Sequence, residues 1–377
     1  MRLVTITHCY PARGGGIERV ASRLIDEFVA SGLNVEWVSS DTAPPPESMP
    51  GRVATPIPTI NIIERLTRLP YPIWTAQAFG RLWRAIGRGD LVHIHEHLYV
   101  GSMLAALIAW IRGRPLVITQ HSGAQGLGNR ASTALYCIFS RLVGMCVFPA
   151  GKRVVFVSAN VRSFFKLQAD ERARLIFNGT DPDLFSLLPL ERRTLVRAQL
   201  ALPTDRRVVL FVGRFLRKKG LDVMERLASR MPGIQWLFVG AGPDDPSAWR
   251  LAQVTVAGQV DQATVASYYH ASDLLLLPSH GEGFPLVVQE ALACGLGVLS
   301  TTEVASACPQ ASHLIRAVAT PRNAVDTEAW EQALRSVLED QNYLDDRSSR
   351  AFCARQLWSW KNCAAGYLQL FQEVRKS

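Results

Sequence analysis

The chain has 377 residues, of which 48% are hydrophobic, and its formal net charge is +9. This length exceeds one ordinary domain and suits two, each large enough to bury its own core. The seven cysteines are scattered and include no Cys-x2-Cys pair, which argues against a structural zinc site and favours a reducing compartment.

The positive charge is unevenly distributed along the chain. Residues 1–180 contain 20 Lys and Arg but 11 Asp and Glu, whereas the remaining residues contain 21 of each kind. A basic half favours anionic partners such as lipid headgroups or diphosphates, although solubility alone explains it equally well. The N-terminus lacks the pattern of a signal peptide, and the longest apolar run, Leu98–Ile111, is too short to span a bilayer. We therefore expect a cytoplasmic protein that does not cross a membrane but can lie on its inner face.

Short apolar runs alternate with helical stretches in the first half of the chain. Three glycines, Gly14–Gly16, separate the first predicted strand from a helix over Ile17–Ser31. This alternation is typical of βαβ units, whose parallel strands are buried on both faces. The predicted strands are Arg2–Thr7, Val35–Ser39, Leu91–His95, Leu116–Thr119 and Val154–Ser158. The stretches around Pro44–Pro46 and Pro56–Pro58 predict an irregular loop.

A second series of the same kind follows a polar, proline-bearing stretch, Asp181–Asp205, and the domain boundary is expected near Asn178–Pro189. Its predicted strands are Val208–Val212, Trp236–Val239, Thr255–Ala257, Leu274–Leu277 and Gly297–Ser300. Its predicted helices are Val223–Arg230, Ala263–His270, Leu286–Ala293 and Thr327–Glu339. We therefore predict an α/β fold of two doubly wound, Rossmann-like domains, residues 1–183 and 184–357, that face each other across a ligand-binding cleft.

The glycine run after the first strand is the first candidate binding motif. Glycines permit a close backbone approach and the start of a helix attracts anions, so Gly15 and Gly16 are candidates to contact a phosphate or a sugar. The spacing is not that of dinucleotide-binding proteins, and a plain tight turn is the alternative.

Two cationic positions follow the first strand of the second domain. Arg214 comes directly after that strand and a glycine, and Lys219 follows within one loop, ahead of Gly220. Both side chains would emerge at the carboxyl edge of the sheet, where they suit a diphosphate. A solvated turn explains them equally well when they are considered alone.

The segment Ser279–Ala291 is the most informative one. Glu282 lies between two glycines after a predicted strand, and Leu286 begins a helix that carries Glu290. Both carboxylates would face one ligand edge and accept hydrogen bonds from sugar or ribose hydroxyls, while the first helical N–H groups would face a phosphate. An ordinary helix-terminal carboxylate explains Glu290 but not the Gly-Glu-Gly loop.

Taken in order, these motifs resemble family 4 of the retaining glycosyltransferases, which have the GT-B fold. The resemblance covers nearly the whole chain. It is carried by Gly14–Gly16, Thr119-Gln120-His121, Asn178-Gly179-Thr180-Asp181, Gly213-Arg214, Lys219-Gly220 and the pair Glu282 and Glu290. It implies that the N-terminal domain binds the acceptor, that the C-terminal domain binds a nucleotide sugar, and that a terminal helix over residues 358–377 crosses back to the first domain.

The resemblance also implies roles for individual residues. Arg214 and Lys219 would hold the donor diphosphate. Glu290 would bind the ribose hydroxyls and Glu282 the donor sugar, with His121 near the transferred sugar. Arg214, Lys219, Glu282 and His121 are thus the expected catalytic residues. The further residues expected to contact the donor are Gly15, Gly16, Gly258, Phe284, Leu286 and Val287.

Two details qualify the comparison with that family. Pro285 stands where the family often has a glycine, and it removes one N–H that would bind phosphate, so the amides of Leu286 and Val287 would have to serve. Asp181-Pro182-Asp183 superficially resembles a metal-binding Asp-x-Asp motif, but it lies at the predicted domain boundary. Since two cations already suit the diphosphate, we expect no catalytic metal and no cofactor.

Two further features are compatible with binding or with packing. His93, His95 and His97 would share one face of a continuing strand, where they would bind zinc or line the cleft near the acceptor. The stretch Pro72–Arg88 has one apolar and one basic helical face, which suits a membrane interface or packing on the protein's own sheet.

The predicted function is that of a retaining hexosyltransferase that moves a sugar from a nucleoside diphosphate donor to a hydroxyl acceptor. A UDP-sugar is favoured over a GDP-sugar, and the acceptor is expected to be a lipid-linked or cell-surface glycan intermediate, as in lipopolysaccharide biosynthesis. An anionic membrane surface is a further expected partner of the basic N-terminal domain, and nucleic acid is not. The alternatives are a nucleotide-sugar epimerase, which would need no acceptor, and a non-catalytic nucleotide-sugar-binding protein.

Overall fold

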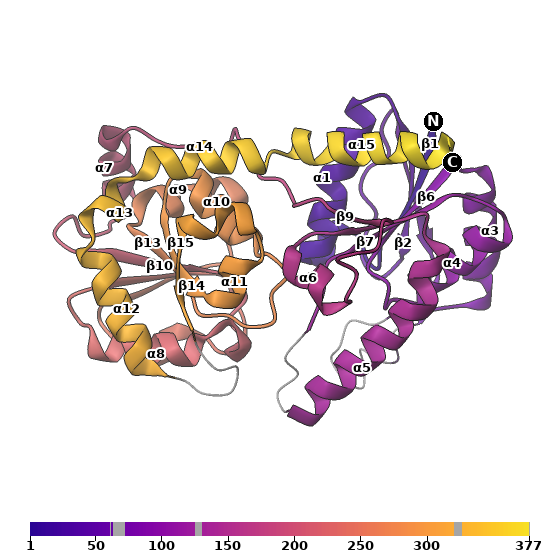
Figure 1. The fold of residues 1–377 in the computed structure, drawn as a ribbon. Helices are drawn as coiled ribbons and strands as arrows, with labels where there is room; N and C mark the ends of the chain where they lie inside the picture. The colour runs from indigo at the N-terminus through magenta and orange to yellow at the C-terminus, as the bar shows by residue number, and fades with distance from the viewer. Residues whose placement is uncertain (61, 63–71, 125–129, 320–325, 377) are drawn as a thin grey trace. The chain divides into compact units, whose positions relative to one another are not determined.

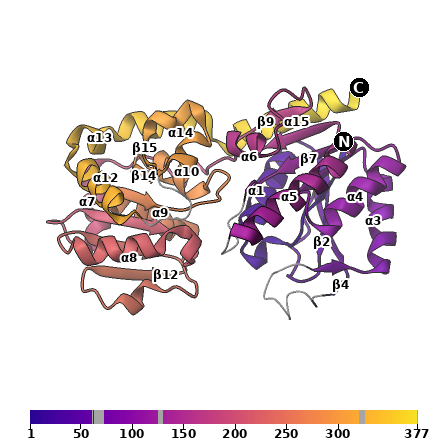
Figure 2. The ribbon, with the colours of Figure 1, turned by 60° about the horizontal axis from the view of Figure 1, so that its bottom comes forward.

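The structure is a computed structural model that describes residues 1–60, 62, 72–124, 130–319 and 326–376. The chain forms two compact units. The first comprises Met1–Ala124, Ala131–Gly179 and the segment that begins at Trp360, and the second is built on Thr180–Ser359. Each unit contains a parallel sheet with helices on both of its faces (Figures 1 and 2).

The sheet of the first unit has seven parallel strands in the order β3-β2-β1-β6-β7-β8-β9. They are β1 (Arg2–Ile6), β2 (Asn34–Ser40), β3 (Arg52–Ile57), β6 (Leu91–His95), β7 (Leu116–Gln120), β8 (Arg153–Phe156) and β9 (Ala173–Leu175). The central strands β6 and β7 are buried throughout, as is typical of a parallel sheet covered on both faces, although each ends in polar residues. A separate antiparallel ribbon is formed by β4 (Thr59–Ile60) and β5 (Ile73–Trp74).

The helices of the first unit cover the two faces of this sheet. They are α1 (Gly16–Ala30), α3 (Ala76–Arg88), α4 (Val100–Ile111), α5 (Arg130–Val147), α6 (Ala159–Phe164) and α15 (Trp360–Lys376), with the short turns η1 (Pro11–Arg13) and η2 (Phe148–Ala150). Because side chains alternate along a strand, Val92 and Ile94 of β6 join the apolar core under α3 and α4. His93, between them, instead packs against Phe28 of α1 and Phe371 of α15.

The terminal helix α15 belongs to the first unit although it follows the second in sequence. The ring of Phe371 lies 5.3 Å from that of Phe28. The hydroxyl of Tyr367 lies 2.9 Å from that of Thr119 on β7. These contacts place the last segment of the chain on the face of the sheet that α1 also covers (Figure 1).

The sheet of the second unit has six parallel strands in the order β12-β11-β10-β13-β14-β15. They are β10 (Val208–Val212), β11 (Gln235–Val239), β12 (Val254–Gly258), β13 (Leu274–Leu277), β14 (Gly297–Thr301) and β15 (Ile315–Val318). The helices are α7 (Leu190–Gln199), α8 (Leu221–Arg230), α9 (Gln262–Ala271), α10 (Leu286–Ala293), α11 (Thr302–Ser306), α12 (Thr327–Glu339), α13 (Gln341–Asp345) and α14 (Arg347–Leu357). Three short turns, η3 (Arg217–Lys219), η4 (Pro246–Trp249) and η5 (Pro309–Leu314), complete the unit.

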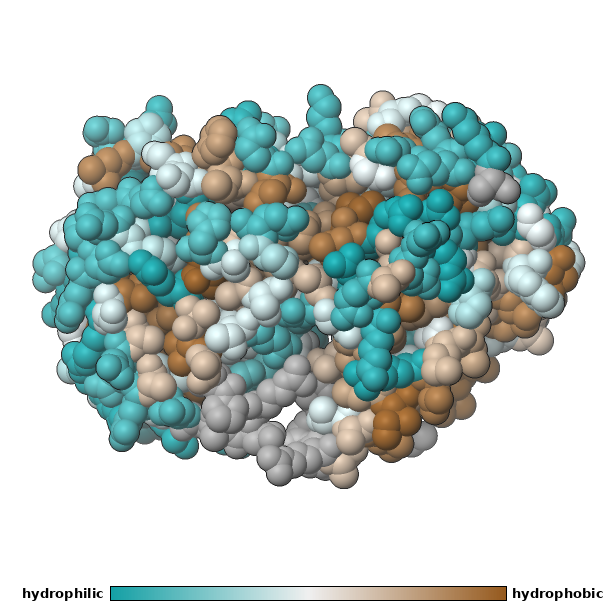
Figure 3. All heavy atoms as spheres, viewed as in Figure 1, coloured by the Kyte–Doolittle hydropathy of each residue, from teal (hydrophilic) through white to brown (hydrophobic). Residues whose placement is uncertain are grey.

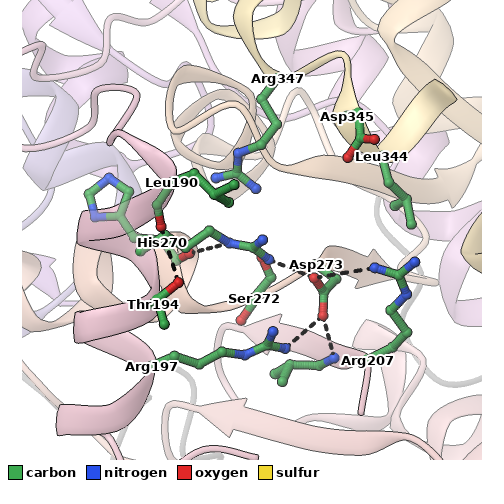
Figure 4. Close-up of polar contacts among 12 residues, drawn as sticks. Leu190, Thr194, Arg197, Arg207, His270, Ser272, Asp273, Leu344, Asp345 and Arg347 are labelled. Carbon is green, nitrogen blue, oxygen red and sulfur yellow. Dashed lines mark hydrogen bonds and ion pairs between the residues drawn. The ribbon is translucent and has the colours of Figure 1, made fainter. Parts of the chain in front are cut away.

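A buried carboxylate ties α7 to the amino ends of β10 and β13 (Figure 4). Asp273 accepts hydrogen bonds from Arg193 (2.6 Å), from Arg197 (2.7 Å) and from the amide of Val208 (2.7 Å). Burial alone would raise the pKa of Asp273, but Arg193 and Arg197 outweigh burial and lower it. This cluster therefore lies at the end of the sheet opposite to the carboxyl ends of the strands and stabilises the unit.

The structure confirms two doubly wound α/β sheets, differs locally from the predicted elements and decides one alternative that the sequence left open. Arg52–Ile57, expected to lie in an irregular loop, forms β3, because an edge strand tolerates the missing N–H of Pro56. The strands β9 and β15 were not predicted, since both are short and lie at sheet edges. The helix within Pro72–Arg88 buries Leu82 and Ile86 in the protein's own core, so its apolar face packs internally.

Candidate functional site

The second unit has a switch in strand order between β10 and β13, which are neighbours although β11 and β12 lie between them in sequence. In such sheets, ligands bind in the crevice outside the carboxyl ends of the strands at this point. The two loops that leave this edge contact each other, since the amide of His280 donates to the carbonyl of Lys218 (3.3 Å). Gly220 has a φ of +81°, and a Cβ there would lie 2.5 Å from the carbonyl oxygen of Pro278. A glycine is therefore required where the loops meet.

These two loops bring together three cations and one carboxylate. The ammonium of Lys219 forms an ion pair with Glu282, and both side chains are largely shielded from solvent. Desolvation lowers the pKa of the nearby Lys218, an effect that Glu282 opposes. Lys219 and Arg214 repel the Lys218 ammonium and lower its pKa further. The cluster thus has an excess of positive charge, which a bound anion would neutralise.

Arg214 is an exposed member of this cluster, directly after β10. The sequence motif had paired it with Lys219, and the structure adds Lys218 as a third cation. Lys218 and Lys219 are adjacent in one loop, and their sequence alone does not indicate which of them faces the site. The backbone of the β13–α10 loop is further held by Glu303, whose carboxylate accepts from the amide of Gly281 (3.1 Å). That residue lies in α11 and carries no sequence signal of its own.

Glu290 is held in place by a residue from a different helix. It lies one turn into α10 and is 6% exposed. The hydroxyl of Tyr269, on α9, donates to one of its carboxylate oxygens at 2.8 Å. Such a carboxylate is fixed in orientation and retains acceptor capacity for hydroxyl groups. Tyr269 was not identified from the sequence, because a tyrosine in a helix looks like an ordinary core residue.

The remaining residues predicted to bind the donor are distributed around this edge. Pro285 precedes the first turn of α10, to which Leu286 and Val287 belong, and in such a turn backbone N–H groups lack intrahelical acceptors. Gly258 ends β12, with open space where a side chain would point. The ring of Phe284 is buried against Trp358, 5.3 Å away, so it supports the loop from inside the unit.

The first unit has its own switch in strand order, between β1 and β6. The loops that follow these strands meet where His8 stacks on Tyr99 at 3.7 Å. Gly15 is the N-cap of α1, and the carboxylate of Glu18 lies where a side chain on Gly15 would be. Burial raises the pKa of this carboxyl group. The start of α1, where Gly15 and Gly16 were expected to contact a ligand, therefore already faces an acidic group of the protein.

His121 follows β7 at the same edge and is paired with a second histidine. Its Nε2 lies 3.0 Å from Nδ1 of His95. Burial lowers the pKa of His121 to about 4 and that of His95 well below its ordinary value. Both imidazoles are therefore neutral at pH 7, so each has one ring nitrogen that donates and one that accepts.

His93, His95 and His97 do not share one face, contrary to the prediction, because β6 ends at His95. Glu96 has a φ of +67°, which ends the strand and turns the chain. As a result, His93 and His95 lie side by side at 4.4 Å, while His97 turns away to bond Glu96 (3.2 Å) and Gln120 (2.7 Å). Burial alone would lower the pKa of His97, but its bonds to Glu96 raise it. Both ring nitrogens of His97 face oxygen acceptors, an arrangement that favours the protonated form beside Glu96.

Within the described residues, no group of three or more His, Cys, Asp or Glu side chains is arranged to hold a metal ion. The carboxylate of Asp181 accepts from the amide of Asp183 (3.1 Å), a local contact that shapes the turn between the two units' sequences.

Comparison with known families matches both halves of the chain. Residues 14–184 match the family described as "Glycosyltransferase Family 4", and residues 192–352 match "Glycosyl transferases group 1". A D-inositol 3-phosphate glycosyltransferase of Thermobispora bispora is 26% identical over 395 aligned residues, which cover 95% of this chain and 89% of that protein.

Solved structures share the fold over nearly the full length. Sucrose-phosphate synthase from Thermosynechococcus elongatus superposes with a TM-score of 0.78 at 21% identity, with 99% of each chain covered. Anabaena Alr3699/HepE, in complex with UDP-glucose, superposes with a TM-score of 0.72 at 16% identity, with 99% of this chain and 100% of that one covered. These likenesses establish the GT-B fold.

Proposed function

Since this chain belongs to family 4 of the glycosyltransferases and has the GT-B fold, we propose that it transfers a sugar from a UDP-sugar to a hydroxyl acceptor with retention of configuration. The observation that supports this most strongly is the cationic cluster of Arg214, Lys218 and Lys219 at the strand switch of the second unit. A GDP-sugar is the second choice of donor.

The cationic cluster would act on the leaving diphosphate. As the bond between the anomeric carbon and the phosphate oxygen breaks, negative charge grows on that oxygen. Arg214 and Lys219, fixed before the reaction, would stabilise this charge more strongly than they bind the intact donor. Lys219 exchanges part of its contact with Glu282 for a phosphate oxygen, which frees a carboxylate oxygen for the donor sugar.

The carboxylates would orient the rest of the donor. Glu290, held by Tyr269, would accept hydrogen bonds from the two ribose hydroxyls. Glu282 would face the hydroxyls of the transferred sugar. Each of these contacts is geometric: it fixes the anomeric carbon relative to the acceptor rather than supplying a proton.

The first unit would hold the acceptor near His121. A neutral imidazole donates or accepts a hydrogen bond without adding charge beside the sugar. No side chain at the described edge is assigned as a nucleophile. We propose that the acceptor hydroxyl attacks from the face that the diphosphate leaves, and that a phosphate oxygen takes its proton. The acceptor is proposed to be a lipid-linked or cell-surface glycan intermediate, and an anionic membrane is the proposed surface on which it is met.

A thermal-shift panel with product analysis tests this function. UDP, GDP and their sugars are each added to the protein, since a ligand that binds the folded state alone raises its melting temperature. We expect the largest shift with UDP or a UDP-sugar. If none of the nucleotides raises the melting temperature, the proposed donor site is refuted. A sugar isomerised in the absence of an acceptor would instead identify an epimerase.

A further inference from the structure

Helix α5 presents an apolar face to solvent in the first unit. Five large apolar side chains on this helix are between 53% and 73% exposed. They are Leu135, Ile138, Phe139, Leu142 and Met145. Their spacing of three and four residues places them on one side of the helix, and they are hereafter called the apolar face of α5. In Figure 3, apolar residues gather over the position of this helix.

The opposite side of α5 is anchored to the unit. The carbonyl of Ser140 accepts from Nε2 of His97 at 2.9 Å. Gly144 lies against the ring of Phe148, where a side chain would crowd it. The segment Ala131–Ala150 is long and apolar enough to cross a membrane by length and composition. Because one side of the helix is packed on the protein, however, only the other side is available to an apolar phase, which is the arrangement of a helix that lies in a membrane interface.

The charge of the surrounding sequence selects the kind of membrane. From His97 to Ala169 the chain contains no Asp or Glu, but it contains eight Lys and Arg. These are Arg112, Arg114, Arg130, Arg141, Lys152, Arg153, Arg162 and Lys166. Of these, Arg141, Lys152 and Lys166 are exposed. An apolar face within a purely cationic stretch suits anionic lipid headgroups, which attract each nearby cation.

A second helix adds an aromatic residue of the type found at membrane interfaces. Trp110, 68% exposed, lies near the end of α4, and α4 packs against η2, the turn that directly follows α5. Tryptophan is enriched at the headgroup level of bilayers. These observations argue against a subunit interface on this surface. Two identical copies would bring stretches of the same positive charge together, and these would repel each other.

We infer that the apolar face of α5 docks on an anionic lipid bilayer and holds the first unit at the membrane surface. The inference rests on the proposed function only in that a lipid-linked acceptor would be met there. Binding to vesicles requires neither donor nor acceptor, so the two are tested separately.

Vesicle binding by a triple variant is the first test. The variant carries Leu135→Glu, Phe139→Glu and Leu142→Glu. The matched control carries Leu190→Glu and Leu195→Glu, two exposed apolar positions on α7 of the second unit. We expect wild type and control to cosediment with vesicles that contain phosphatidylglycerol but not with pure phosphatidylcholine, and the triple variant to bind at least about tenfold more weakly. Equal binding by the triple variant, or no binding by wild type, overturns the inference.

A dye on Cys146 locates the contact. Cys146 is exposed near the end of α5, and an environment-sensitive thiol dye is attached to it in a Cys137→Ser, Cys353→Ser background. The control carries the dye on Cys353 in the second unit, with Cys137 and Cys146 replaced by Ser. Anionic vesicles are expected to shift the emission of the first dye to the blue and to leave the second unchanged.

Three further outcomes assign the face elsewhere. A dimer in light scattering that the triple variant dissolves would make the apolar face of α5 an interface between copies. A dye response to UDP without vesicles would assign it to the nucleotide-binding unit of the same chain. UDP binding by calorimetry is measured on the triple variant throughout, and its retention shows that a loss of vesicle binding is not a loss of fold or of the donor site.

Discussion

Replacement of Asp273 by Asn removes the charge that three basic side chains of the second unit share (Figure 4). The Asp273 side chain is 5% exposed, and those of Arg193 and Arg197 are 15% and 12% exposed. An asparagine keeps the size of the side chain but offers one acceptor atom and turns an N–H group toward an arginine. Loss of one partner from a buried ion pair costs about 3–5 kcal/mol, and we expect the free energy of unfolding of this unit to fall by that amount.

The assay for this loss must report on the second unit. Hydrogen exchange followed by mass spectrometry, with increasing urea, measures protection in the peptides of β10 and β13 separately from those of the first sheet. The control is Asp205→Asn, since that carboxylate is 76% exposed and lies 3.9 Å from Arg206. An exposed pair of this kind contributes at most about 1 kcal/mol. A loss in Asp273→Asn no larger than in this control would refute the reasoning.

The same variant predicts a pH dependence with a definite sign. The pKa of Asp273 is lower in the folded state than in the unfolded chain. At any pH within the carboxyl range, the unfolded chain therefore binds more protons than the folded state does. The stabilisation is therefore complete above the ordinary carboxyl pKa and is lost as the pH falls toward the lower folded value. The difference in stability between wild type and Asp273→Asn should shrink below about pH 4.

Three further predictions concern the site. Gly220→Ala should destabilise the second unit by about 1–3 kcal/mol in urea unfolding, because the φ of Gly220 is +81° and a Cβ would crowd Pro278. The control, Gly233→Ala, places a Cβ in open space and should be neutral or nearly so. The pKa of His121 is lowered to about 4, so His121 should contribute no inflection to kcat/KM between about pH 5.5 and 7.5. An inflection in that range that His121→Asn abolishes would contradict a neutral imidazole. Because cations of the protein are proposed to neutralise the diphosphate, transfer should retain its rate within about twofold in excess EDTA, and a loss restored by Mg²⁺ or Mn²⁺ would show that a metal is required.

The regular parts of the fold were predictable because their physical signals are local. Strands such as Val208–Val212 and Leu274–Leu277 are buried on both faces, so their sequences are almost purely apolar and their bounds agree with those of β10 and β13. Glycine-rich turns after these strands marked the carboxyl edge of the sheet. The structure indeed brings Lys219 and Glu282, 63 residues apart, into one ion pair there.

Features that depend on tertiary contacts were not predictable. Tyr269 reaches Glu290 from another helix, so this contact has no signature in residue spacing. His97 left the expected face because Glu96 adopts a left-handed conformation that favours glycine and that no local pattern indicated.

The location of a solvent-exposed apolar face also required the structure. The sequence of Pro72–Arg88 has the more regular pattern of apolar and basic faces, yet that helix packs internally. The helix α5 has a weaker pattern, because residues such as Ser140 and Gly144 on its buried side are small rather than large and apolar. Burial, which only the structure supplies, shows which of the two apolar faces is open to solvent.

The central claim is that Arg214 and its neighbours bind the diphosphate of the donor, and calorimetric titration with UDP and UMP tests it most directly. The two nucleotides differ in one phosphate, so a residue that contacts this phosphate affects UDP alone. We predict that Arg214→Ala weakens UDP binding by about 10- to 100-fold, the value of a charge-assisted contact, and leaves UMP binding nearly unchanged. Arg226→Ala, an exposed arginine on α8, should change neither. Equal losses for UDP and UMP in Arg214→Ala, or no loss for either, would contradict the assignment of the diphosphate site.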